Sequence, residues 1–361
     1  MDKTKELLLK IRTAIESGKL TAMEVPLEDM KQCVYAEIEL YRNMVTESKY
    51  LNILESYKRL CANVAEGEWD TTKIIILLDA MLLCLDSLSD TVRALADREY
   101  WEYKHSDKLS DPHVQEIISY IDKNQRVSLL NYDFMDEYKN LEVELYLDEE
   151  CQMIYAPYKG KKMYFPRSWD GTKIVQYYCS VIAEQDVRSP HCYRHTGYMV
   201  KPGDVIVDVG AAEGIFALDV IDIASKIYLI EADMEWIEAL QQTFREEEKV
   251  QIIYGFADAV AEGDRVTLDS LFADGVDYIK MDIEGYEKPA LLGAERLMRE
   301  SQNLTCAICS YHCKEDEEWI RNYLQKYGFT IEVSAGYICP DWTVEAYLEA
   351  ELRRGVVFGK K

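Results

Sequence analysis

The sequence predicts an α/β protein whose main part is a Rossmann-like, mostly parallel sheet of seven strands, preceded by an all-α helical domain and a small β-meander. From about residue 201, short apolar runs alternate with amphipathic segments, which is the pattern of parallel strands covered by helices on both faces. Residues 3–125 instead repeat apolar side chains at intervals of three and four, with almost no strand pattern. Short alternating runs between residues 127 and 168 indicate antiparallel strands.

The helical domain is expected over residues 1–125, with breaks at 67–70 and 110–112. It contains no group of polar residues at a spacing typical of a catalytic site, so packing, homodimerisation and binding of a protein partner are its expected roles. The most apolar run, residues 74–85, includes Asp79 and is too short to span a bilayer.

Residues 126–200 are predicted to form the β-meander and a linker helix from Gly171 to Glu184, a segment that would cap a substrate. Residues 201–361 form the predicted cofactor-binding domain. Its strands are expected at Val205, Ile227, Val250, Tyr278, Thr305, Thr330 and Val356, and its helices near Phe216, Trp236, Glu287 and Glu315.

Charge and cysteine content limit the partners and the compartment. Among 361 residues, 66 are acidic and 41 are basic, and the net charge of -25 opposes contact with nucleic acid or anionic lipid. The ten cysteines, without a recognisable export signal, predict free thiols and a cytoplasmic location.

The most informative segment is VIVDVGAAEG, residues 205–214. A strand that ends in Asp208 breaks at Gly210, and a helix begins at Gly214, as in nucleotide-type binding sites. The spacing is GxxxG rather than GxGxxG, and Glu213 would place a negative charge at the turn. A pyrophosphate would be repelled there, so the pattern favours S-adenosylmethionine, an adenosine cofactor without phosphate.

Each predicted cofactor contact has a chemical reason. Asp208 would order the turn and meet the methionine ammonium, while Glu231, 21 positions after Gly210, would accept hydrogen bonds from the ribose hydroxyls. Asp258 would accept from the adenine amino group or, alternatively, cap its own backbone. The predicted cofactor-binding residues are Asp208, Gly210, Ala211, Gly214, Glu231, Ala232, Asp258 and Asp282.

A second motif, DYIKMDIEGYE, places Lys280, Asp282 and Glu284 at alternating positions of a strand expected to end at Gly285. Their side chains would share one face at the carboxyl edge of the sheet, where open α/β sheets bind ligands. We expect Lys280 to pair with Glu284 or Glu287.

The segments GDVIVDVGAAEGIFAL, YLIEAD, TLDSLF and IKMDIEGYEKPALLGA resemble the FkbM family of S-adenosylmethionine-dependent methyltransferases, over about residues 185–359. This resemblance implies a class I Rossmann-like methyltransferase fold and methylation of a hydroxyl on a sugar, glycan or secondary metabolite. Nitrogen as acceptor stays open. The alternatives are a noncatalytic scaffold whose helical domain binds a protein partner and a nicotinamide oxidoreductase, which the GxxxG spacing disfavours.

Methyl transfer to an alcohol needs a base near the methyl group. His312, after the strand that follows the Asp282 strand, is the preferred base because imidazole titrates near neutral pH. Asp282 is the competitor, as a base or as a ligand of magnesium together with Glu284. A divalent metal is not favoured, because a matching third carboxylate is lacking.

The acceptor pocket is predicted to involve His191, Tyr193, Lys280 and Glu284. Alternatively, the segment of His191 and Tyr193 forms a rigid turn together with Ser189 and Pro190. The run CAICSYHC, residues 306–313, is interpreted as a structural strand rather than a metal cluster, because alternation sends its ligands to opposite faces.

Overall fold

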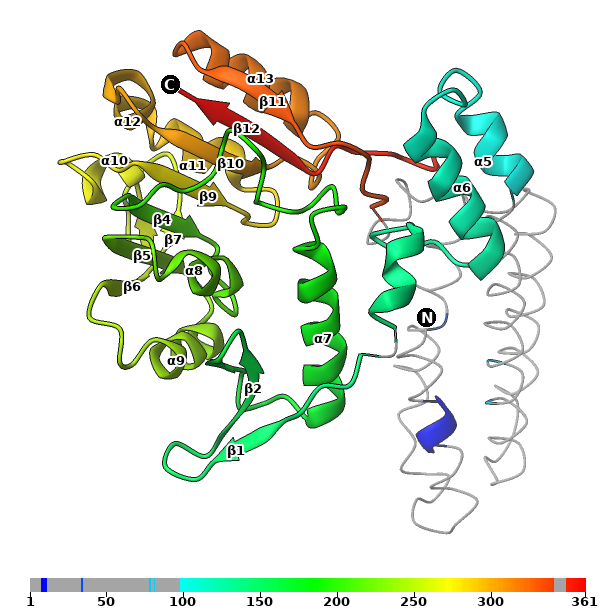
Figure 1. Cartoon of the computed structure of the whole chain (residues 1–361), viewed down its shortest axis with the longest axis horizontal. Helices are drawn as coiled ribbons and strands as arrows, with labels where there is room; N and C mark the ends of the chain where they lie inside the picture. Colours follow the sequence, from blue (N-terminus) through cyan, green and yellow to red (C-terminus); the bar gives the residue numbers. More distant parts are fainter. Residues whose placement is uncertain are drawn as a thin grey trace, which may run out of the picture. The chain divides into compact units, whose positions relative to one another are not determined.

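The computed structural model describes residues 8–11, 34, 78, 81, 98–139, 141–340 and 349–361. Most of the predicted helical domain therefore lies outside the described residues, and its extent and role stay predictions. Within the described part, helices α5 (Arg98–Lys104) and α6 (Pro112–Asn124) are separated where the sequence predicted a break (Figure 1). None of the described helices combines the length and the apolar character needed to cross a bilayer.

The chain forms two compact units. One comprises residues 1–111, 117–128 and 341–351, and the other comprises residues 112–116, 129–340 and 352–361. The second unit contains every predicted site residue.

The second unit is built on one large sheet (Figure 1). Its strands are β4 (Val205–Val209), β5 (Lys226–Glu231), β6 (Val250–Tyr254), β9 (Tyr278–Met281), β10 (Thr305–Cys309), β11 (Thr330–Val333) and β12 (Val356–Lys360). They lie in the order β11-β12-β10-β9-β4-β5-β6, in which β12 is antiparallel to both neighbours and the other pairs are parallel. The predicted seven-stranded, mostly parallel sheet is confirmed.

The order of the strands reverses between β4 and β9. Strands β5 and β6 continue on one side of β4, whereas β10 lies on the far side of β9. In open α/β sheets, ligands bind outside the carboxyl ends of the strands beside such a reversal. The fold therefore brings the segments after Val209 and Met281 to the place where a ligand is expected.

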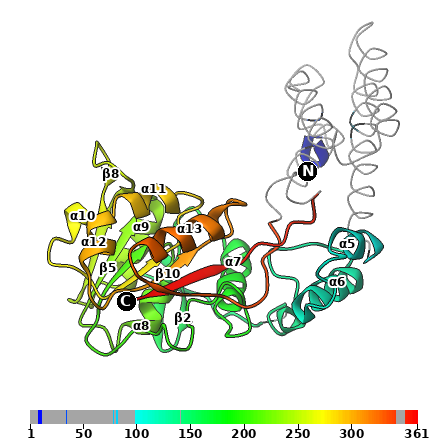
Figure 2. The same cartoon turned by 90° about the horizontal axis from the view of Figure 1, so that it is seen from above.

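Helices cover the sheet and close its core. They are α8 (Ile215–Val220), α9 (Met234–Thr243), α10 (Leu268–Leu271), α11 (Glu287–Leu292), α12 (Glu295–Glu300) and α13 (Asp316–Lys326). In Figure 2, α8 and the group α11–α13 lie on opposite sides of the sheet. Because both faces are covered, β9 and β10 are buried along their whole length. A short parallel pair, β7 (Phe256–Ala257) and β8 (Arg265–Val266), lies beyond β6 in the chain.

The meander and the linker helix precede the sheet. A 3-10 turn, η2 (Asp133–Glu137), is followed by the antiparallel strands β1 (Tyr146–Asp148), β2 (Met153–Tyr158) and β3 (Lys161–Tyr164) and by helix α7 (Gly171–Glu184). Asp170 caps α7 by accepting a hydrogen bond from the Lys173 N–H. The meander packs on α9, where the Tyr164 N–H donates to Thr243 Oγ1 at 3.0 Å. The predicted meander and linker helix are therefore present, although the first expected strand is limited to three residues.

Candidate functional site

The turn after β4 has an unusual backbone that only small side chains permit. Gly210, Ala212 and Gly214 all have positive φ, at +75°, +43° and +80°. A Cβ at Gly210 would overlap the carbonyl oxygen of Asp282, and one at Gly214 would press on the ring of Phe244. The GxxxG spacing is thus required both by the turn and by its close packing.

Glu231, at the end of β5, is held against the same turn. Its Oε2 accepts from the Ala212 N–H at 2.9 Å, and its Oε1 accepts from the N–H groups of Ala232 and Asp233 at 2.7 and 2.9 Å. Oε2, which accepts one of these hydrogen bonds, can accept a further one. The structure therefore brings together the predicted residues Gly210, Glu231 and Ala232 at neighbouring strand ends, with Ala211 buried beside them.

Asp208 and Lys280 form a buried ion pair across β4 and β9. Lys280 Nζ lies 2.9 Å from Asp208 Oδ1 and donates to the Gly210 carbonyl at 2.6 Å. Burial disfavours the lysine charge, but the carboxylate outweighs burial and raises the pKa of Lys280. The expected pairing with Glu284 or Glu287 is wrong, because Lys280 pairs with Asp208 instead. Asp208 is fully buried and orders the turn through Lys280, so no surface of it is exposed to meet an ammonium.

Glu213 is buried rather than directed outward. Its Oε2 accepts from the hydroxyl of Tyr177 on α7 at 2.6 Å, and burial raises the pKa of Glu213 to about 7. The expected negative charge at the turn is therefore reduced near neutral pH. The Tyr177 ring lies 5.0 Å from Trp169 and 5.4 Å from Trp236 of α9, an aromatic cluster that sequence reasoning missed. The sequence feature that could have revealed this cluster is the pair of adjacent tyrosines in the linker helix.

Asp258 is engaged in its own loop. Its Oδ1 accepts from the Ala259 N–H at 2.6 Å, and its Oδ2 accepts from Arg265 at 2.8 Å. This is the geometry of the backbone-capping alternative. Contact with an adenine amino group stays a prediction.

The segment after β9 turns sooner than expected. Strand β9 ends at Met281, and Glu284 and Gly285 both have positive φ, at +56° and +93°. The expected common face of Lys280, Asp282 and Glu284 is therefore wrong: the turn leaves the Glu284 side chain 92% exposed, whereas that of Asp282 is 17% exposed.

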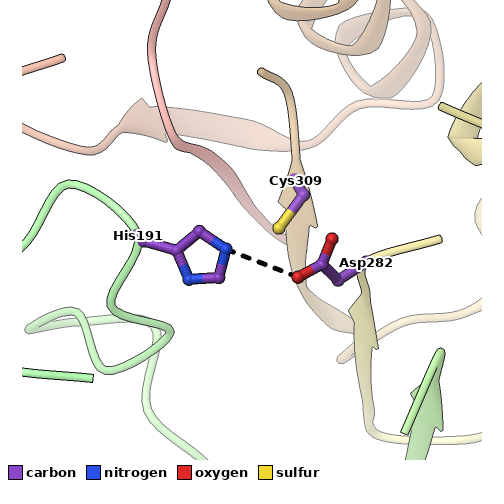
Figure 3. A group of neighbouring side chains, drawn as sticks. All are labelled: His191, Asp282 and Cys309. Carbon is purple, nitrogen blue, oxygen red and sulfur yellow. Dashed lines mark ion pairs between the residues drawn. The ribbon is translucent and has the colours of Figure 1, made fainter. Parts of the chain in front are cut away.

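Asp282 is the centre of a polar cluster formed by three segments. Its Oδ2 accepts from the hydroxyl of Tyr193 at 2.7 Å and lies 3.4 Å from His191 Nε2. Figure 3 shows the imidazole of His191 directed at this carboxylate, with Cys309 of β10 beside them. His191 also contacts the hydroxyl of Tyr311 at 3.0 Å. The fold thus brings two of the predicted pocket residues to Asp282, together with Tyr311, which the sequence reasoning overlooked.

The ionisation of Asp282 follows from these neighbours. Burial alone would raise its pKa, but His191 and the charges of Lys280 and His312 outweigh burial and hold the pKa of Asp282 well below its usual range. Asp282 is therefore an anion at neutral pH and a weak base.

His312 lies on the other side of Asp282, three residues beyond β10. Its Nε2 is 3.5 Å from Asp282 Oδ1, and its Nδ1 is 3.0 Å from Oε1 of Glu287, the first residue of α11. Burial lowers the pKa of His312, but these carboxylates outweigh burial and raise it to about 9. His312 occupies the expected edge of the sheet, but it carries its proton at pH 7 in this arrangement. His312 could act as a base only after losing that proton.

Two groups of ligand atoms meet at Asp282. One comprises His191, Asp282 and Cys309, and the other comprises Asp282, Glu287 and His312, with the atoms of each group within 4.8 Å of one another. In the second group, Glu287 is the third possible ligand beside Asp282 and His312. The sequence pattern did not reveal it, because Glu287 follows a turn whose shape cannot be read from the sequence.

Comparisons with known proteins identify one domain of the chain. Residues 241–331, which include the IKMDIEGYE motif, match the Methyltransferase FkbM domain. No curated protein matches the sequence.

Several solved structures are similar to part of the chain. A methyltransferase FkbM from Methylobacillus flagellatus KT has 20% identity and a TM-score of 0.40, over 52% of this chain and 52% of its own length. This chain therefore spans about half of that protein. A SAM dependent methyltransferase from Aquifex aeolicus has 14% identity and a TM-score of 0.34, over 54% of this chain and 98% of its own. The domain match over residues 241–331 confirms the resemblance to the FkbM methyltransferases that the motifs predicted.

Proposed function

We propose that this protein is an S-adenosylmethionine-dependent methyltransferase that acts on a hydroxyl of a sugar, glycan or secondary metabolite. The FkbM domain match supports the reaction class. The observation that carries the proposal furthest is the contact of Gly210 with the carbonyl of Asp282. This contact joins the GxxxG turn, which suits an adenosine cofactor without phosphate, to the polar cluster at the strand reversal. A methyl donor and a methyl acceptor would therefore lie side by side.

The residues at the turn fit the cofactor. Glu231 presents a carboxylate at the end of β5, and its two oxygens are already oriented by the backbone of the turn. The left-handed backbone at Gly210 leaves no Cβ between the turn and the Asp282 segment. Bound S-adenosylmethionine supplies the methyl group as a sulfonium.

The Asp282 cluster fits an acceptor with hydroxyl groups. Tyr193, His191 and His312 surround the ionised carboxylate of Asp282, which is 17% exposed and can accept a hydrogen bond from a sugar hydroxyl. Methyl transfer is an in-line displacement, so orientation of the acceptor oxygen and exclusion of water supply much of the rate. The anionic Asp282 also favours a neighbouring sulfonium.

The experiment is calorimetric titration with S-adenosylmethionine. The wild type should bind, and Glu231→Ala should bind at least about tenfold more weakly, because charge-assisted hydrogen bonds to the ribose are lost. Glu246→Ala, an exposed carboxylate elsewhere on the same unit, is the matched control and should bind as the wild type does. The absence of binding heat in the wild type would overturn the proposal.

A separate experiment tests whether the methyl acceptor is an oxygen atom. The enzyme is incubated with S-adenosylmethionine and panels of glycans, hydroxylated metabolites and amines. Mass spectrometry should show one added methylene on a hydroxyl compound together with release of S-adenosylhomocysteine. Methylation confined to amines would contradict an oxygen acceptor.

The remaining expectations concern location and assembly. The seven described cysteines are free thiols, which supports the proposed cytoplasmic, reducing compartment. Homodimerisation through the helical domain remains a proposal that sedimentation analysis of the full chain tests.

A further inference from the structure

We propose that Asp282, Glu287 and His312 bind a divalent first-row cation such as Mn²⁺ or Zn²⁺. The role suggested for this ion rests on the proposed methyltransferase function, whereas its binding does not. The three residues come from the turn after β9, the start of α11 and the segment after β10. Their ligand atoms lie within 4.8 Å of one another.

The backbone holds all three residues in place. The Asp282 N–H donates to the Val209 carbonyl at 3.0 Å, which anchors the turn to β4. The Ile283 N–H donates to Glu287 Oε1 at 2.9 Å, and Arg353 donates to the carbonyl of His312 at 2.6 Å. A set of ligands that is already positioned pays little ordering entropy when an ion binds.

A second observation points to a ligand at this place. Glu287 is fully buried, and within the described part of the chain its Oε2 has no hydrogen-bond partner. A buried carboxylate oxygen without a partner is unfavourable, because it has lost its hydrogen bonds to water and gained none in return. Such an oxygen indicates a bound ion or water. A cation between Glu287 and Asp282 satisfies it directly.

The neighbouring group around His191 and Cys309 is a weaker candidate (Figure 3). There Asp282 Oδ2 already accepts from Tyr193 at 2.7 Å, and His191 Nε2 is already 3.0 Å from the hydroxyl of Tyr311. Hydrogen bonds therefore satisfy the atoms on that side. The other carboxylate oxygen, Oδ1, lies 3.5 Å from His312 Nε2, and the hydrogen bond that it accepts from the Tyr311 hydroxyl is longer, at 3.5 Å.

The donor set selects the ion. Two carboxylates and one imidazole suit first-row divalent cations, whereas Ca²⁺ and Mg²⁺ prefer oxygen ligands alone. Three protein ligands leave coordination positions open, as in catalytic sites. Glu284, whose Oε2 is 3.6 Å from His312 Nε2, is the solvent-exposed neighbour of this group. An acceptor hydroxyl that enters there would have its pKa lowered by the ion. In this proposal His312 is a ligand rather than the base.

The test is Mn²⁺ binding to the full chain, measured by the loss of the free-ion electron paramagnetic resonance signal. Mn²⁺ is the probe because free thiols bind Zn²⁺ elsewhere. The chelator-treated wild type should bind one equivalent. Glu287→Gln keeps an oxygen for the Ile283 N–H and should weaken binding at least about tenfold. Excess Ca²⁺ should not displace Mn²⁺.

Controls separate the alternatives. Glu295→Gln, on α12 away from the cluster, and Cys309→Ala should both bind Mn²⁺ as the wild type does. If Glu287→Gln does not fold, the same measurement is made on His312→Asn. Lack of binding by the wild type, or unchanged binding by the folded ligand variants, would overturn the proposal. So would loss of binding in Cys309→Ala with Glu287→Gln unaffected. Binding of S-adenosylmethionine is measured in a separate titration, so that failure of the proposed function can be distinguished from failure of the proposed metal site.

Discussion

Gly210 lies so close to Asp282 that a Cβ at position 210 would overlap the Asp282 carbonyl oxygen. This contact joins the two motifs that are most informative in the sequence, one after β4 and one after β9. The Asp282 N–H donates to the Val209 carbonyl beside it. A change on one side would therefore displace the backbone on the other, which couples the turn after β4 to the Asp282 cluster.

Gly210→Ala is expected to destabilise the fold by about 2 kcal/mol or more and to weaken S-adenosylmethionine binding, because both the positive φ and the overlap oppose a Cβ. Urea denaturation and calorimetry measure the two effects. Gly203→Ala is the matched control, since Gly203 has φ of +91° but open space around its Cα. Equal losses in the two variants would show that the contact with Asp282 contributes nothing.

Lys280→Met is expected to destabilise the protein by about 3–5 kcal/mol, because it leaves the Asp208 carboxylate buried without a counter-charge. The double variant Asp208→Leu/Lys280→Met should recover much of this loss. Arg321→Met, which breaks an exposed pair with Glu317, should change the free energy of unfolding by less than about 1 kcal/mol. Additive losses in the double variant would contradict a buried ion pair.

The sheet was predictable from the sequence because its strands carry continuous apolar runs between helical segments. Each expected strand start lies within one residue of the observed one, as at Val205, Tyr278 and Thr305. Periodicity determines such elements locally, and the parallel order follows from the helical crossovers.

The site was less predictable, because its geometry depends on turns. Alternation extended the Asp282 strand to Gly285, but β9 ends four residues earlier, at Met281, and a turn with left-handed backbone at Glu284 follows it. That turn is what brings Glu287 to His312. The pairing of Lys280 with Asp208 was likewise hidden, because it depends on the register of β4 against β9.

Glu213 is expected to make stability fall as pH rises from about 4.5 to about 7. Its pKa in the folded protein, about 7, exceeds the ordinary 4.5, so the folded state binds more protons across this interval. The stabilisation of the protonated form, at most about 3 kcal/mol, is complete below the interval and lost above it. Lys280 favours ionisation of Glu213 and Glu184 opposes it.

Chemical denaturation at pH 5 and pH 8 measures this effect. Glu213→Gln should remove that part of the pH dependence. Tyr177→Phe should extend the interval to higher pH by raising its upper limit, because the tyrosine hydroxyl donates to the ionised carboxylate in the folded protein. An identical pH dependence in the wild type and Glu213→Gln would contradict the burial of an ionisable Glu213.

Removal of the proposed cation should separate binding from turnover. After dialysis against a chelator, S-adenosylmethionine should still bind, because the N–H groups of Ala212 and Ala232, rather than any proposed metal ligand, hold the Glu231 carboxylate in place. Methyl transfer to an acceptor identified by mass spectrometry should fall by at least about tenfold and return with Mn²⁺. His312→Asn should show the same low turnover with and without Mn²⁺ while binding the cofactor normally. A chelated wild type with full turnover would contradict a role for the ion in catalysis, and a His312→Asn variant restored by Mn²⁺ would exclude His312 as its ligand.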